Sequence, residues 1–84
     1  MRFRGIEFRW CSFDKKYEIV KWYKDGGKEY CCVVALFDET KEGYDMRTIG
    51  SRFFEDKDAF IVGKHAIQFL NAMFYELERE KELE

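Results

Sequence analysis

The sequence predicts an α+β domain in which a four-stranded antiparallel β-meander is followed by one long C-terminal α-helix packed on one sheet face. Two observations lead to this prediction. Up to about residue 55 apolar residues alternate with polar ones, and from Asp56 they recur at every third or fourth position. The chain has 84 residues, enough for one hydrophobic core but not for two. We therefore expect a single domain over residues 1–84.

Each expected strand follows from a local pattern. Large apolar residues alternate with charged ones from Ile6 to Trp10, and the apolar run 30–37 is typical of a central strand. Residues 25–27, Asp-Gly-Gly, tolerate the positive φ that a tight hairpin turn requires. Gly50 predicts a break or bulge in the last strand. The expected strands cover about residues 3–11, 17–24, 28–37 and 44–54.

The helix is expected over about residues 57–80. Asp56 or Asp58 can cap its first amide groups. Gly63 lies within the apolar stripe, where a missing side chain permits close approach to the sheet. We expect residues 83–84 to be a cloning remnant. The opposite side carries residues expected in solvent, Lys64, Gln68, Asn71 and Tyr75.

Composition narrows the classes of protein to consider. The longest apolar run, 30–37, is far shorter than the roughly 20 residues of a membrane-spanning helix, so we expect no membrane association. Charged residues interrupt the start of the chain before a signal peptide could form. Cys11, Cys31 and Cys32 are an odd number without framework spacing, which predicts free thiols and a cytoplasmic location.

Catalytic and metal-binding patterns are weak. The adjacent Cys31 and Cys32 should leave opposite faces of a strand, and His65 is the single histidine. The acidic residues between Asp38 and Asp45 miss the spacing of calcium loops, and no glycine-rich phosphate loop precedes the helix. The sequence therefore predicts no enzyme, no cofactor and no metal site.

Charge is distributed unevenly along the chain. Residues 1–28 hold eight basic and four acidic side chains, whereas residues 29–84 hold seven basic and thirteen acidic ones. A basic sheet that bears aromatic rings could follow a single-stranded backbone and stack its bases, although the acidic chain as a whole is atypical of nucleic-acid binders. The candidate binding residues are Lys21, Trp22, Tyr23, Lys24, Arg47 and Arg52.

A helix on one face of the sheet leaves the other face uncovered. We expect Phe37, Tyr23 or Tyr17 to form an exposed aromatic patch there, larger than a monomer usually leaves in water. A protein partner or a homodimer would cover it. The predicted function is a non-enzymatic binding or regulatory protein with a protein partner, and single-stranded nucleic-acid binding is the alternative.

Two resemblances add to this prediction. The segments GYDMRTIGSRFFE (43–55) and YEIVKWYKDGGKEYCC (17–32) resemble small proteins of bacteriophages and prophages of Gram-positive bacteria. That resemblance implies an accessory role, docking on a host protein. The expected topology is also similar to that of single-strand-binding coactivators of the positive-cofactor-four and Whirly type, in topology and not in motif residues.

Overall fold

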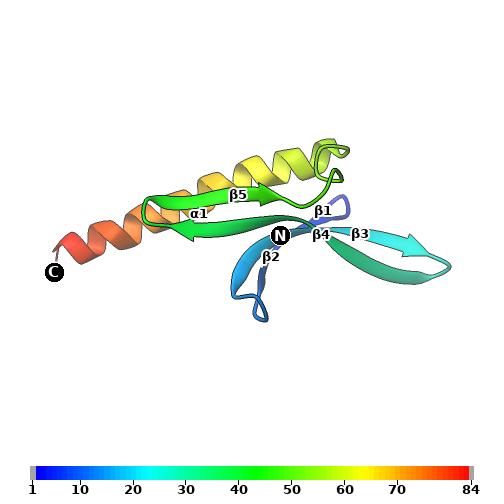
Figure 1. Cartoon of the computed structure of the whole chain (residues 1–84), viewed down its shortest axis with the longest axis horizontal. Coiled ribbons are helices and arrows are strands. Elements are labelled where there is room, and N and C mark those ends of the chain that lie inside the picture. Colours follow the sequence, from blue (N-terminus) through cyan, green and yellow to red (C-terminus); the bar gives the residue numbers. More distant parts are fainter. Residues whose placement is uncertain (1, 84) are drawn as a thin grey trace.

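The structure, a computed structural model, describes residues 2–83 as an antiparallel sheet followed by one helix (Figure 1). Strands pair in the order β1-β2-β3-β4-β5, each with its neighbour in sequence. The α+β class, the antiparallel meander and the C-terminal helix are confirmed, but the sheet has five strands, not four. The elements are β1 (Arg2–Phe3), β2 (Ile6–Cys11), β3 (Lys16–Asp25), β4 (Lys28–Thr40), β5 (Gly43–Thr48) and α1 (Lys57–Leu83).

The first predicted strand, 3–11, is confirmed over residues 6–11 as β2, but its start is wrong because the chain turns back at Arg4 and Gly5. These residues have φ values of 50° and 81°. The turn pairs Phe3 with Ile6 and leaves β1 as a two-residue strand beside β2. Gly5 is the one turn-forming residue in an otherwise alternating segment, so the pattern gave little sign of the reversal.

The last predicted strand, 44–54, is also wrong in extent, since β5 ends at Thr48. Gly50 has φ 67°, and the turns at residues 51–55 direct Phe53 into the core. The Phe53 side chain is only 1% exposed. Burial of this ring favours a turn over continuation of the strand.

The middle two predicted strands, 17–24 and 28–37, are confirmed, although β4 continues to Thr40. Gly26 and Gly27 form the two-residue turn between them with φ values of 56° and 83°. Positive φ at both positions is the property of a type I′ turn, whose twist matches that of the paired strands. This end of the β3–β4 hairpin projects from the rest of the molecule (Figure 1).

A bulge interrupts the β3–β4 ladder near its centre. Ile19 pairs with Ala35, but the next residue, Val20, pairs with Val33, so that Val34 has no opposite residue. An extra residue in one strand bends it and increases the local twist. The sheet is accordingly curled (Figure 1).

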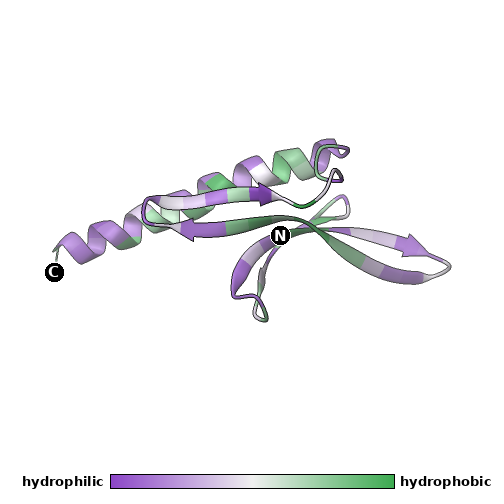
Figure 2. Ribbon diagram, viewed as in Figure 1, coloured by the Kyte–Doolittle hydropathy of each residue, from purple (hydrophilic) through white to green (hydrophobic). Residues whose placement is uncertain are grey.

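The core lies between the sheet and α1, which packs against β5, β2 and β3. Figure 2 shows the hydrophobic residues in the central strands and in the first turns of the helix. Phe37 is buried in this core and Tyr17 packs against it, which corrects the expectation that these rings lie on the uncovered face. The buried residues of the core are Ile6, Ile19, Val34, Ala35, Phe37, Phe53, Ala59, Val62, Ala66 and Leu70.

Gly63 allows the helix to approach the sheet closely, as its position in the apolar stripe predicted. A Cβ atom there would lie 2.9 Å from Cζ of Phe53 and 3.1 Å from Sδ of Met46. Both contacts are shorter than ordinary van der Waals separation, so the site accepts no side chain without movement of its neighbours.

Both ends of the helix-on-sheet contact are fixed by polar groups. Oδ1 of Asp56 accepts hydrogen bonds from N–H of Asp58 (2.8 Å) and of Ala59 (3.4 Å), so Asp56 is the N-cap. Further along, Oδ1 of Asn71 accepts from N–H of Tyr44 at 2.8 Å. Asn71 was expected in solvent, but it instead satisfies an outward amide of the edge strand β5.

The helix begins at residue 57 as predicted and ends three residues later than predicted, at Leu83. The residues from Tyr75 to Leu83 are all exposed. Within residues 2–83, no helix combines the length and the apolar character needed to cross a bilayer. Of the proposed cloning remnant, Glu84 lies outside the described residues.

Replacement of Gly63 by leucine should destabilise the protein by about 3 kcal/mol. Leucine favours the helix more than glycine does, so any loss must come from the clash with Phe53 and Met46. Urea denaturation followed by circular dichroism measures the change. Lys64→Leu, at the neighbouring exposed position, is the control and should change the free energy of unfolding by less than about 0.5 kcal/mol. Equal effects of the two variants would contradict the packing role of Gly63.

Candidate functional site

Three of the six candidate residues come together on the projecting hairpin. The Lys21 Nζ atom lies 5.4 Å from the Tyr23 ring centroid, and Arg52 Cζ lies 5.5 Å from it. The Tyr23 ring also stacks on Tyr30, with 5.2 Å between centroids. The result is a pair of stacked rings flanked by two cations, a cluster built from β3, β4 and the loop before α1.

The cation Lys21 is already partnered. Its Nζ lies 3.1 Å from Oδ2 of Asp56, the N-cap of α1. The hydrogen bond with Asp56 raises the pKa of Lys21, although burial acts in the opposite direction. Burial alone would raise the pKa of Asp56, but the bonds from Lys21 and the helix amides outweigh it and lower that pKa. Lys21 thus ties the sheet to the start of the helix.

Trp22 lies on the opposite face of β3 from Lys21 and Tyr23, as alternation along a strand requires. Its Nε1 donates to Oε1 of Glu7 at 3.0 Å, and Cζ of Arg2 lies 4.8 Å from the ring centroid. A base that stacked on this face of the indole would have to displace the Arg2 guanidinium.

The other two candidates stand apart from that cluster. Arg47 Nε donates to Oδ2 of Asp38 at 2.9 Å, and Lys16 contacts the other carboxylate oxygen. The hydrogen bonds from Arg47 and then Lys16 lower the pKa of Asp38 to about 2. Lys24 is exposed near the hairpin turn, opposite Glu29 in the strand register. The six residues therefore do not form one surface.

Paired charges dominate the sheet face opposite α1. The guanidinium of Arg9 lies 3.5 Å from Oε1 of Glu7, 3.5 Å from Oε2 of Glu18 and 3.7 Å from Sγ of Cys31. Glu18 is only 2% exposed, so its charge requires this cation nearby. The uncovered face is a network of ion pairs with one tryptophan, not the aromatic patch that was expected.

One cluster of possible metal ligands was not foreseen from the sequence. Ligand atoms of Cys11, Asp14 and Glu18 lie within 4.8 Å of one another at the β2–β3 turn. The three residues are close together because β2 and β3 pair on either side of this turn. Arg9 already supplies a positive charge to Glu18, the buried member of the group. We read the cluster as part of the ion-pair network.

An apolar surface runs along α1 and continues onto the segments before it. A hollow lined by Phe54, Phe60 and Ile61 adjoins a second one lined by Phe3, Ile61 and His65. Two turns further along, Phe69 contacts the ring of Phe8 from β2, with 6.5 Å between centroids. We call the exposed large residues of this surface the apolar strip: Phe3, Phe54, Phe60, Ile61 and Phe69.

The apolar strip was not predicted from the sequence, because Phe60 and Phe69 fall in the apolar stripe of the helix, which was expected to be buried. Ile61 is 46% exposed and Phe69 is 57% exposed, although the apolar stripe of the helix passes close to both. The signal was the width of that stripe, which exceeds the arc that one sheet can cover.

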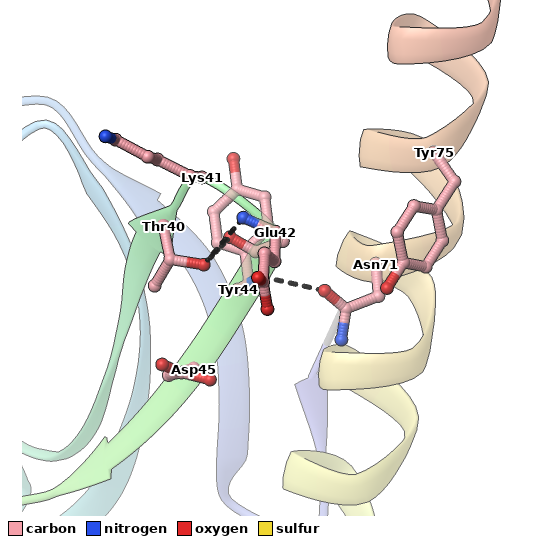
Figure 3. A pocket seen from close by; sticks show the side chains of 8 residues that line it. Thr40, Lys41, Glu42, Tyr44, Asp45, Asn71 and Tyr75 are labelled. Carbon is pink, nitrogen blue, oxygen red and sulfur yellow. Dashed lines mark hydrogen bonds between the residues drawn. The ribbon is translucent and has the colours of Figure 1, made fainter.

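A polar hollow of about 460 Å³ lies beside the β4–β5 turn and α1 (Figure 3). Its hydrogen bonds serve the fold. Thr40 Oγ1 accepts from N–H of Glu42 within the turn, and Asn71 joins Tyr44 to the helix. Figure 3 shows Tyr75 beside Asn71 on the helix, with Lys41 pointing away. The hollow is better explained as the junction of strand and helix than as a ligand site.

Comparison with known proteins gave no relatives. No family model matches the chain, and searches of curated proteins and of solved structures found no match.

The Asp38 carboxylate should contribute to stability in a defined pH range. Because its pKa is lowered to about 2, the contribution is complete above the unfolded-state value of roughly 4 and is lost as the pH falls toward 2. Between pH 6 and pH 3 the free energy of unfolding should fall less for Asp38→Asn than for the wild type, as measured by denaturation at each pH. Added salt should weaken the effect, since the pair is partly exposed.

The control is Asp25→Asn at the exposed end of β3. Its free energy of unfolding should fall between the two pH values by as much as that of the wild type. A side-chain NMR titration that put the Asp38 midpoint near 4 would contradict the assignment.

Proposed function

We propose that this protein is a non-enzymatic binding protein that docks on another protein through the apolar strip. The observation that supports the proposal is five large exposed apolar side chains along α1 and the segments beside it in an 84-residue chain, four of which line two adjoining hollows. Single exposed apolar residues are common on soluble proteins, but a continuous patch is typical of an interaction surface.

The composition and support of the strip favour protein binding. Four of its five members are phenylalanines, and aromatic residues are enriched in the buried centres of protein interfaces. Val62, Ala66 and Leu70 hold α1 against the sheet, so the three strip members on that helix stand on a rigid element. A rigid surface loses little conformational entropy when it binds.

Single-stranded nucleic acid is kept as the second candidate. Stacked Tyr23 and Tyr30 with Arg52 nearby are the observation that favours it, since bases stack on such rings. Against it, Lys21 is bound to Asp56 and Arg47 to Asp38, which leaves fewer free cations for phosphates.

The resemblance to small phage and prophage proteins would make the partner a bacterial host protein. This part of the proposal depends on the segments 17–32 and 43–55 alone. The three free cysteines are the reason to place that activity in the cytoplasm.

Substitution within the apolar strip should abolish binding to protein. The immobilised protein is exposed to bacterial host lysate and, separately, to purified untagged copies of itself, and captured protein is quantified. Ile61→Glu and Phe69→Glu should each reduce the amount of captured protein at least about tenfold, because a buried unpaired charge is costly. The changed residues are exposed, so the thermal midpoint should stay close to that of the wild type.

Phe13→Glu is the matched control, because Phe13 is 93% exposed at the β2–β3 turn, outside the strip. It should capture as much as the wild type. Capture of nothing, or equal loss in all three variants, counts against the proposal. Binding of a single-stranded oligonucleotide that weakens steeply with salt would instead support the second candidate.

A further inference from the structure

The last turns of α1 lie beyond the sheet. The residues from Glu76 to Leu83 are all exposed, and Figure 1 shows this end of the helix projecting past the β4–β5 turn. Short helical segments are marginal in water, because most helical stability in proteins comes from packing. A second helix alongside would provide that packing.

A side of α1 that the sheet leaves exposed carries a suitable row of residues. Ile61 and Phe69 of the apolar strip lie on this side together with His65 and Ala72, since residues three or four apart share a helix face. All four are exposed. The small side chain of Ala72 lets another helix come close, while Phe69 supplies the largest buried area.

Charge along the helix shows which direction a second helix should take. The first half of α1 carries Lys57 and Lys64 against one acid, Asp58, which pairs with Arg4 from the β1–β2 turn. The second half is acidic overall, with four glutamates against Arg79 and Lys81. The glutamates are Glu76, Glu78, Glu80 and Glu82.

An antiparallel helix of the same sequence supplies both the missing packing and the opposite charge. With a two-fold axis between Gln68 and Phe69, the acidic half of each helix lies along the basic half of the other. The two helix dipoles then oppose each other, which is also favourable. Leu83 of each copy reaches the level of the exposed Phe54 of the other copy.

We infer that the partner of the apolar strip is a second copy of this chain, and that the two copies pair through antiparallel α1 helices. The inference rests on the proposed function, because it requires the strip to bind protein. Other surfaces suit self-association less well, since the sheet face opposite α1 carries paired charges and Asn71 bonds to the Tyr44 amide at the β5 edge.

Sedimentation equilibrium over a range of concentrations tests the pairing. The wild type should approach twice its monomer mass of 10.2 kDa, and Phe69→Glu should remain monomeric. The control Phe13→Glu should associate as the wild type does. A wild type that stays monomeric at every concentration overturns the inference, as does a dimer that Phe69→Glu leaves intact.

Reversal of charge tests the antiparallel direction. Variant A carries Lys57→Glu and Lys64→Glu, and variant B carries Glu78→Lys and Glu82→Lys. Each alone should dimerise at least about tenfold more weakly, because like charges meet at both symmetry-related contacts. An equimolar mixture of A and B should recover the wild-type dissociation constant within about twofold, because opposite charges meet again in the mixed dimer.

These changes separate pairing from folding. An acidic residue at the start of α1 and a basic one near its end both favour the helix dipole, so neither variant should lose helix content. A mixture no tighter than its components would overturn the antiparallel arrangement. A monomeric wild type that still captures a host protein through the strip would leave the proposed function standing, whereas a monomer that captures nothing would remove both.

Discussion

The close approach of α1 to the sheet at Gly63 is the constraint on which the other features depend. Because no side chain separates the helix from Phe53 and Met46, the helix axis is held near the sheet, and Asn71 can reach the amide of Tyr44. The N-cap Asp56 and its bond to Lys21 fix the other end of the same contact. Together these contacts set which residues of α1 are buried and which stay exposed.

That placement explains why the exposed apolar surface lies on the helix and not on the sheet. The core residues of the sheet lie on the side that faces α1. The other side carries ion pairs, including that of Arg9 with Glu18. The apolar stripe of α1 is wider than the sheet can cover, so Ile61 and Phe69 remain in solvent. A surface of this kind is suited to a second helix.

Much of the architecture could be predicted from periodicity, because alternation and the three-to-four repeat are local properties of the chain. Gly26 and Gly27 marked a turn, and Gly63 marked a close contact, since glycine has few other uses at such positions. The turn at Arg4 and Gly5, the early end of β5 and the burial of Phe37 depended on tertiary packing. The candidate site was harder to predict from the sequence, because the strand order and register decide which of Lys21, Trp22 and Arg47 share a face.

Occupation of the β5 edge by the helix has a consequence for the behaviour of concentrated solutions. Strands left open at a sheet margin act as templates on which further chains add without limit, the route to fibrils. Here Asn71 occupies the amide of Tyr44, and the helix screens that margin. Asn71 thereby competes with any strand that would add at the Tyr44 amide, and the helix pairing that we propose would close after two copies instead of growing.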